Sequence, residues 1–248
     1  MKNPVSVSSL TQRDTQISIM LIGMMFFIFG FVSWANSILI PYFKIACELT
    51  NFKAYLVTFA FYISYFIMSV PASYVLKSIG FKKGMMLGFW IMSIGAFIFI
   101  PAAMSRAYPI FLLGLFTLGT GLAILQTAAN PYITLLGPKE SAAQRISIMG
   151  ICNKGAGILA PLAFAAVILK ATDSDLFKSL EHMSGANRNL ALNELIQRVI
   201  VPYFCVGILL FLLGLAVRFS PLPEIETDEE NEETTQANSN KTSILQFP

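Results

Sequence analysis

The amino-acid sequence predicts an all-α membrane protein with six transmembrane helices, from its composition and from the spacing of its charged residues. Of its 248 residues, 55% are hydrophobic and 12% are charged, whereas soluble domains carry about 25% charged residues. The mean hydropathy is +0.66. This composition excludes a soluble globular domain, a disordered chain and a protein that binds nucleic acid. The expected surroundings are therefore a lipid bilayer.

Runs of the sequence that are almost free of charge identify the individual helices, because a charge inside the bilayer is costly. Six runs reach the ~20 residues needed to cross a bilayer. They are Thr15–Phe43, Ala54–Leu76, Gly84–Ser105, Ala107–Pro138, Ile146–Leu169 and Val199–Val217. The first run is too long for the apolar core of a signal peptide and lacks a cleavage site after it, so we expect it to be retained. The first and fourth runs are long enough to tilt or to continue beyond the hydrocarbon.

The domain organisation follows from these runs. Residues 1–14 form an expected N-terminal segment and residues 15–219 the six-helix domain. Residues 220–248 form a polar, acidic linker, in which seven of the fourteen acidic residues lie between Glu224 and Glu233. Apolar sequence resumes at Ile244 and ends at Pro248, so we expect a second half to follow the linker.

The basic residues between the runs indicate the orientation of the chain. With the N-terminus inside, nine Lys and Arg residues lie on the inner side and seven on the outer side, four of these in a long polar outer loop from Lys170 to Arg198. Short loops rich in Lys and Arg stay in the cytoplasm. We therefore expect both termini to be cytoplasmic.

Polar residues recur at helical spacing in four of the six runs. Three residues form the stripe in the first run, Ser33, Asn36 and Ser37. The other stripes comprise Tyr55, Thr58, Tyr62, Tyr65 and Ser69 in the second run, Gln126 and Asn130 in the fourth, and Ser147, Asn153 and Lys154 in the fifth. Interhelical hydrogen bonds, of ~0.6 kcal/mol each, explain any single stripe equally well. The third and sixth runs carry no such stripe, and we call them plain. The pattern therefore indicates two three-helix units, in each of which two helices line a cavity and one faces lipid.

Glycines in the first and fourth runs allow helices to approach closely or to hinge, and the sequence does not separate these two roles. They are Gly23, Gly30, Gly114, Gly119 and Gly121.

Lys154 is the one charged residue in any run, about two turns or ~12 Å from the inner side. Its side chain either has a functional role in a cavity between the helices or extends its ammonium to the membrane–water interface. None of the runs contains Asp or Glu, so this part of the chain lacks the embedded carboxylate that proton-coupled carriers usually need. Three cysteines and a single histidine, His182, provide no metal-binding spacing and no catalytic centre. We expect no enzyme activity, cofactor or metal.

Three segments carry a family resemblance. They are Asn36–Pro41 in the first run, Gln126–Pro131 followed by Leu136–Pro138 in the fourth, and Asn153 in the fifth. From about Phe26 to Leu162 the sequence resembles the fucose/galactose/glucose permease family of the major facilitator superfamily, especially its bacterial glucose/galactose transporter branch. The resemblance implies a twelve-helix carrier of the bacterial cytoplasmic (inner) membrane, with each half built from 3+3 inverted repeats, of which this chain is the N-terminal half. It also implies transport of a hexose with a coupling cation by alternating access.

The sequence departs from this family at the positions that couple transport to protons. The carboxylate of the family's first helix is Ser37 here, and the acid that fucose permeases carry in the fourth helix is Gln126, as in the glucose/galactose branch. Lys154 replaces a serine. Our hypothesis is that proton symport through this half is lost, which leaves Na⁺ coupling, coupling through the second half, or facilitated diffusion. Ser37 and Lys154 are the coupling candidates.

The chemistry of the polar residues suits a sugar. Amide side chains donate and accept hydrogen bonds at once, so we expect Asn36, Gln126, Asn130 and Asn153 to bind sugar hydroxyls. Lys154 would donate to a hydroxyl or pair with an acid of the second half. Trp34 and Tyr62 are candidates to cover the sugar ring. Glucose, galactose, fucose and N-acetylglucosamine all remain open.

Two other functions remain open at this point. One is a half-size carrier that works as a homodimer, and the other is a membrane sugar sensor that does not transport. The expected partner is accordingly a second six-helix half, either covalently attached or a second copy of this chain.

Overall fold

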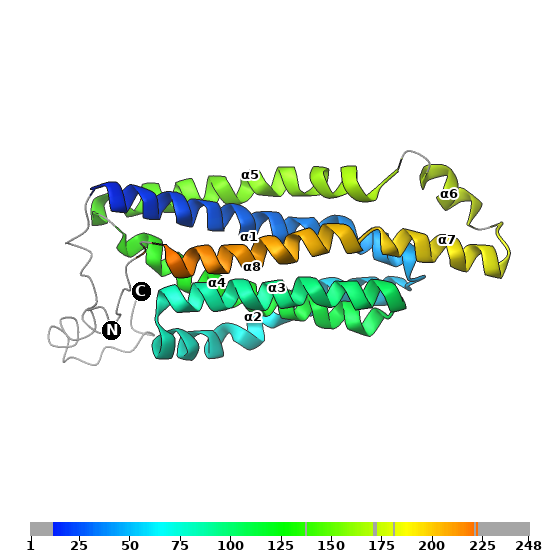
Figure 1. Ribbon diagram of the computed structural model, residues 1–248, viewed down its shortest axis with the longest axis horizontal. Helices are drawn as coiled ribbons and strands as arrows, with labels where there is room; N and C mark the ends of the chain where they lie inside the picture. Colours follow the sequence, from blue (N-terminus) through cyan, green and yellow to red (C-terminus); the bar gives the residue numbers. More distant parts are fainter. Residues whose placement is uncertain (1–11, 137, 171–172, 181, 221, 223–248) are drawn as a thin grey trace, which may run out of the picture.

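A computed structural model describes residues 12–136, 138–170, 173–180, 182–220 and 222, and every regular element among them is a helix. Six long helices run along the length of the molecule, as Figure 1 shows. The elements are α1 (Gln12–Ala46), α2 (Asn51–Ile79), α3 (Phe81–Ser105), α4 (Tyr108–Leu135), a 3₁₀ turn (Lys139–Ser141), α5 (Ala142–Ile168), α6 (Asp173–Ser179), α7 (Gly185–Gln197) and α8 (Ile200–Phe219). We call the end of the bundle where α1 begins the base, and we call α6 and α7 the cap.

The six predicted runs each correspond to one long helix, α1 to α5 and α8, with ends that agree to within four residues. All are long and apolar enough to cross a membrane, so the chain is a multi-pass membrane protein. The first helix has 35 residues and is about 52 Å long at 1.5 Å per residue, which exceeds the ~30 Å hydrocarbon core. Of the expected linker at 220–248, only Ser220 and Leu222 lie within the described residues.

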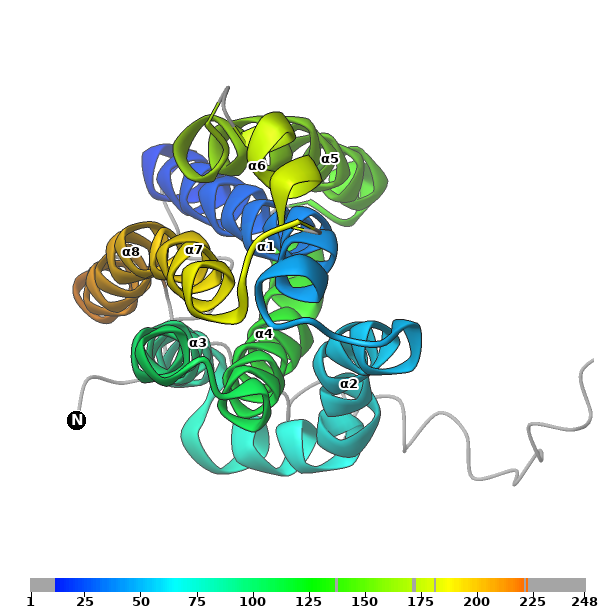
Figure 2. The ribbon, with the colours of Figure 1, turned by 90° about the vertical axis from the view of Figure 1, so that its right-hand side faces the viewer.

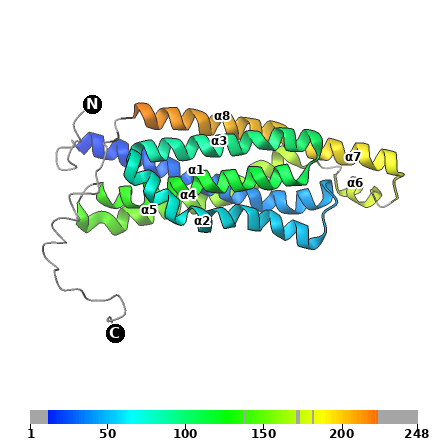
Figure 3. The same ribbon diagram turned by 90° about the horizontal axis from the view of Figure 1, so that it is seen from below.

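The prediction of a long polar loop from Lys170 to Arg198 is wrong, because the structure places the helices of the cap there. Three apolar residues of α7 at helical spacing are buried, Leu192, Leu195 and Ile196. They give α7 one apolar face in an otherwise polar segment. Only Arg198 and Val199 separate α7 from α8, and both have helical backbone angles. In Figure 3, α7 continues the direction of α8 beyond the end of α3.

The arrangement of the helices confirms the 3+3 inverted repeats. The helices α1 and α4 run in opposite directions, and α1 packs against α5 as α4 packs against α2. In two of the three pairs of corresponding helices, the last residues are also separated by the same number of residues in the sequence. The last residues of α1 and α4, Ala46 and Leu135, are 89 residues apart (135 minus 46), as are the last residues of α2 and α5, Ile79 and Ile168 (168 minus 79). The remaining pair, α3 and α8, pack against each other.

Viewed along the bundle in Figure 2, α3 and α8 lie together on one side, α1 and α4 lie in the middle, and α2 and α5 lie at the flanks. The two plain predicted helices are therefore neighbours, and the four helices with polar stripes lie on the other side of them. Ser93 joins the plain pair by donating to the Gly207 carbonyl oxygen at 2.7 Å.

Close helix packing explains several glycines of α1 and α4, but not Gly23, where a Cβ atom would lie an ordinary 3.6 Å from the nearest atom of α5. A Cβ atom at Gly30 would overlap the backbone carbonyl of Asn153 on α5, and one at Gly119 would overlap Ser64 on α2. A Cβ atom at Gly121 would lie 2.6 Å from the Met92 nitrogen on α3. Since real side chains do not make such contacts, these positions require glycine for packing.

Candidate functional site

An aromatic face of α2 points away from the bundle. Its large side chains are more than half exposed, and the first four recur at intervals of three and four residues, which places these four on one face of the helix. They are Tyr55, Phe59, Tyr62, Phe66 and Tyr74. This face borders the side of the bundle that carries the polar stripes.

A pocket of ≈ 220 Å³ lies at the edge of this face, between α1, α2 and α4. Its walls are formed by Ser33, Trp34, Ile40, Val57, Thr58, Phe61, Tyr62 and Leu115. The pocket is smaller than the ~300 Å³ at which complete small-molecule sites begin. Aromatic faces with a few hydroxyl groups suit the apolar patches and the hydroxyls of a sugar ring.

Lys154 is held at this pocket through Trp34. Its Nζ atom lies 5.6 Å from the centre of the Trp34 ring, a cation–π contact of about 0.5–2 kcal/mol depending on solvation. The same ring lies against Gly157 of α5, where a Cβ atom would come within 2.8 Å of the Trp34 Cδ1 atom. Because Gly157 has no side chain, the Trp34 indole can pack between α1 and α5.

Asn153 is engaged in helix packing. Its Nδ2 atom donates to the Phe26 carbonyl oxygen of α1 at 3.2 Å. This bond joins α5 to α1 next to the close approach at Gly30. Of the predicted sugar-binding amides, Asn153 thus has one of its donors occupied by the protein itself.

The other predicted site residues are not in this pocket. Gln126 is partly exposed and Asn130 is exposed on α4, and Gln126 lies about 16 Å along the helix from the pocket residue Leu115. The side chains of Asn36 and Ser37 lie outside the described residues, although their backbone belongs to α1. The structure thus brings together Trp34, Tyr62 and Lys154 and leaves the α4 amides nearer the base.

Ser33 and Thr58 line the pocket although the sequence did not single them out as binding residues. Both were members of the predicted polar stripes. Thr58 lies four residues before Tyr62, and this spacing was the available signal, since residues three or four apart share a helix face. Ser33 is adjacent to Trp34 in the sequence, and adjacency on a helix gives no such signal.

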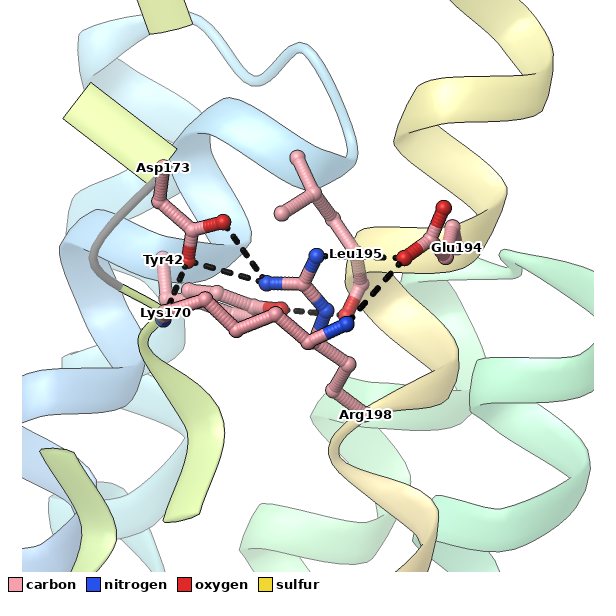
Figure 4. A network of polar contacts seen from close by, with 6 residues as sticks. All are labelled: Tyr42, Lys170, Asp173, Glu194, Leu195 and Arg198. Atoms are coloured by element: carbon pink, nitrogen blue, oxygen red, sulfur yellow. Dashed lines mark hydrogen bonds and ion pairs between the residues drawn. The ribbon is translucent and has the colours of Figure 1, made fainter. Parts of the chain in front are cut away.

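The cap is held by a network of charges that the sequence analysis missed, shown in Figure 4. Arg198 donates to both carboxylate oxygens of Asp173, at 2.8 and 2.9 Å, and to Glu194 at 3.2 Å. Lys170 approaches Glu194 at 3.5 Å, and the Tyr42 hydroxyl of α1 donates to the Leu195 carbonyl oxygen. These contacts tie α6 and α7 to the end of α1. The signal available in the sequence was the Glu194–Arg198 pair, which is four residues apart.

Asp173 is the buried member of this network, with 2% of its surface exposed. Burial alone would raise the pKa of Asp173, but the hydrogen bonds from the Arg198 guanidinium and the Lys170 backbone N–H hold it below its usual value. The carboxylate is therefore charged over the neutral pH range, and its charge is compensated by Arg198.

A second ion-pair cluster joins the cap to the neighbouring helix ends. Glu48, which follows α1, lies 2.9 Å from Arg188 of α7 and 3.4 Å from Arg106 at the end of α3. Arg106 also donates to Asn193 of α7 at 3.3 Å. The cap is thus fastened to α1 and to α3 by separate sets of polar contacts.

At the base, Arg145 of α5 closes the end of α4. It is 5% exposed, and its guanidinium donates to the carbonyl oxygens of Ile133, Thr134 and Pro138 at 2.9–3.0 Å and to the Ser141 hydroxyl at 2.6 Å. The last carbonyls of a helix have no partner within the helix and attract a cation. Arg145 therefore caps α4, the helix that carries Gln126 and Asn130.

Comparisons with known proteins identify relatives over nearly the whole chain. The family model described as the Major Facilitator Superfamily matches residues 22–246. A glucose/galactose transporter of Brucella abortus is 33% identical over 92% of this chain and 52% of its own length. An L-fucose-proton symporter of Escherichia coli is 32% identical over 89% of this chain and 50% of its own length.

Solved structures agree with these relatives. A crystal structure of a Major Facilitator Superfamily transporter in the outward conformation matches with a TM-score of 0.74 and 30% identity, over 87% of this chain and 52% of that one. A crystal structure of the Escherichia coli fucose:proton symporter matches with a TM-score of 0.73 and 28% identity, over 88% of this chain and 53% of that one. The chain spans about half the length of each of these proteins.

Proposed function

Because this chain belongs to the Major Facilitator Superfamily, we propose that it forms one six-helix half of a secondary transporter for a hexose-type sugar. The observation that carries the proposal is the pocket between α1, α2 and α4, where Trp34 and Tyr62 offer ring faces beside the hydroxyls of Ser33 and Thr58. Relatives whose names include glucose, galactose and fucose support the same class of substrate.

The second half of the transporter would cover the exposed side of α2 and α5. The small size of the pocket and the half-length match to the relatives both support this. The α4 amides, Gln126 and Asn130, would then bind sugar hydroxyls in the part of the cavity nearer the base. Alternating access would follow from movement of the two halves about this site.

The proposed location is the bacterial cytoplasmic membrane, with the base on the cytoplasmic side. The base carries Lys77, Lys83 and Arg218 at helix ends, and such residues favour the cytoplasm. The coupling cation would be Na⁺ or a proton bound with help from the second half, because the six predicted membrane runs contain no Asp or Glu.

Sugar uptake by the complete gene product in proteoliposomes tests this function. We expect uptake of radiolabelled galactose, glucose or fucose that is stimulated by an imposed Na⁺ or pH gradient. In Gln126→Ala the half-saturation concentration should rise about fivefold or more, the effect of one lost hydrogen bond.

The matched control is Gln144→Ala, which removes an exposed glutamine in the first turn of α5 at the base. Its uptake should equal that of the wild type. Absence of uptake of all three sugars by the wild type would refute the proposed function, and an equal loss in both variants would refute the assignment of Gln126.

A further inference from the structure

The six membrane runs contain one positive charge and no negative charge, and this imbalance constrains the ligand. Lys154 is the only Asp, Glu, Lys or Arg residue in those runs. Ionisable groups inside a membrane protein normally pair with an opposite charge, because an unpaired one is costly. Among the described residues, no ion pair includes Lys154. Its contact with the Trp34 ring stabilises the ammonium but does not neutralise it.

The surroundings of Lys154 leave room for a small ligand. Gly150 lies one turn before it and Gly155 directly after it, and a Cβ atom at either position would meet no atom within 4 Å. A bare backbone permits a ligand to approach closely. Lys154 is itself exposed, on the same face of α5 as Gly150 four residues before it, so its ammonium is accessible from the open space.

The pocket and the ammonium are joined by one side chain. Trp34 forms a wall of the pocket and also lies beneath the Lys154 ammonium. The pocket walls themselves contain no charged residue. A ligand whose ring occupies the pocket beside Trp34 can therefore place a charged substituent next to the Lys154 ammonium.

We infer that this site takes a hexose that carries a carboxylate, a hexuronate, with the carboxylate bound to Lys154 and the ring placed against Trp34 and Tyr62. A carboxylate carries one negative charge and balances the one ammonium. A sugar phosphate carries about −1.5 to −2 at neutral pH and would leave charge uncompensated. The inference rests on the proposed sugar-transport function and specifies its substrate class.

Calorimetric titration of the complete gene product in lipid nanodiscs tests this inference, with galacturonate and galactose as the paired ligands. We expect the wild type to bind galacturonate at least about tenfold more tightly than galactose, the size of one charge-assisted hydrogen bond. Lys154→Gln should abolish this preference, whereas Lys154→Arg should retain it. Lys53→Gln, which removes an exposed lysine near the cap, should bind both sugars as the wild type does.

Each contrary result overturns a defined part of the account. Galactose binding without a preference for galacturonate refutes the inference alone and leaves the proposed function standing. If Lys154→Gln weakens the binding of both sugars equally, Lys154 donates to a neutral hydroxyl. If this variant changes the binding of neither sugar, another part of the protein neutralises the ammonium. Either result refutes the inference. Failure of the wild type to bind either sugar refutes the proposed function together with the inference.

Discussion

Gly30 controls how closely α1 and α5 approach, because the Asn153 carbonyl occupies the space that a side chain would need. We predict that Gly30→Ala destabilises the folded protein by about 1–3 kcal/mol, the usual cost of inserting a methyl group into a packed contact. Thermal unfolding of the detergent-solubilised protein, followed by tryptophan fluorescence, measures the change.

Gly155→Ala provides the matched control on α5. A Cβ atom there would meet nothing within 4 Å, and alanine is a better helix former than glycine by about 0.5–1 kcal/mol. Its unfolding temperature should equal or exceed that of the wild type. Equal destabilisation by the two substitutions would show that the α1–α5 contact is not as close as the structure has it.

Arg145 shows that a basic residue near a helix end can have a structural role beyond orientation. We predict that Arg145→Met costs about 3 kcal/mol, because it removes one buried cation and leaves several carbonyl oxygens at the end of α4 without donors. In a protein of this size the unfolding temperature should fall by roughly 6 °C or more. Arg218→Met, at an exposed position in the last turn of α8, should leave it unchanged; a similar fall in both variants would refute the capping role.

Sequence reasoning identified Trp34, Tyr62 and Lys154 as candidates but not their arrangement. Helical spacing predicts which residues share a face of one helix. It does not give the distance between faces of different helices, which depends here on the absent side chains at Gly30 and Gly157. For the same reason, the sequence grouped Gln126 with Trp34, although about 16 Å of α4 separates Gln126 from the pocket.

At the scale of helices, the six membrane helices were predictable because the cost of a charge in lipid marks their ends. The cap was not predictable in this way, since α6 and α7 are polar and lie beyond the apolar runs. Leu192, Leu195 and Ile196 do follow a helical period. That period covers barely one turn and a half, which is too short to distinguish a helix from a loop by pattern alone.

The cap should depend on pH through Asp173. A carboxylate whose pKa is lowered in the folded state contributes stability above its ordinary pKa of about 3.9, and this contribution is lost as the pH falls through the lowered value. We predict that Asp173→Asn destabilises the protein by about 2 kcal/mol at pH 7, and that the difference from the wild type shrinks as the pH falls below about 4. Unfolding temperatures of both proteins across this range measure the effect.

Glu194→Gln is the control within the same network. The Glu194 carboxylate also accepts from Arg198, but its side chain is 67% exposed, and exposed ion pairs contribute little to stability. Its effect should be small at every pH. A larger effect for Glu194→Gln than for Asp173→Asn would refute the view that the buried pair holds the cap.

For the whole molecule, the fold follows from two inverted three-helix units, in which α1 and α4, and likewise α2 and α5, end 89 residues apart (135 minus 46 and 168 minus 79). The pattern of striped and plain helices predicted this arrangement, because only the helices beside a cavity need polar residues. The cap interrupts the correspondence between α3 and α8, since it is inserted before α8 and has no counterpart before α3. The exposed aromatic face of α2 and the pocket beside it are the features that a second half would enclose.

The central claim is that the pocket beside Trp34 and Tyr62 binds the sugar ring. The chain has two tryptophans, so in Trp90→Phe the part of the fluorescence change that a further Trp34→Phe substitution abolishes belongs to Trp34. Fluorescence titration of this variant with galactose and galacturonate, in nanodiscs, is the most direct measurement. The account predicts a saturable change in Trp34 fluorescence as sugar is added. Tyr62→Ala should weaken the binding that this change reports at least about tenfold. Tyr74→Ala, which removes an exposed tyrosine of α2 outside the pocket, should leave it unchanged. No saturable change with either sugar, or equal weakening by both tyrosine substitutions, would contradict it.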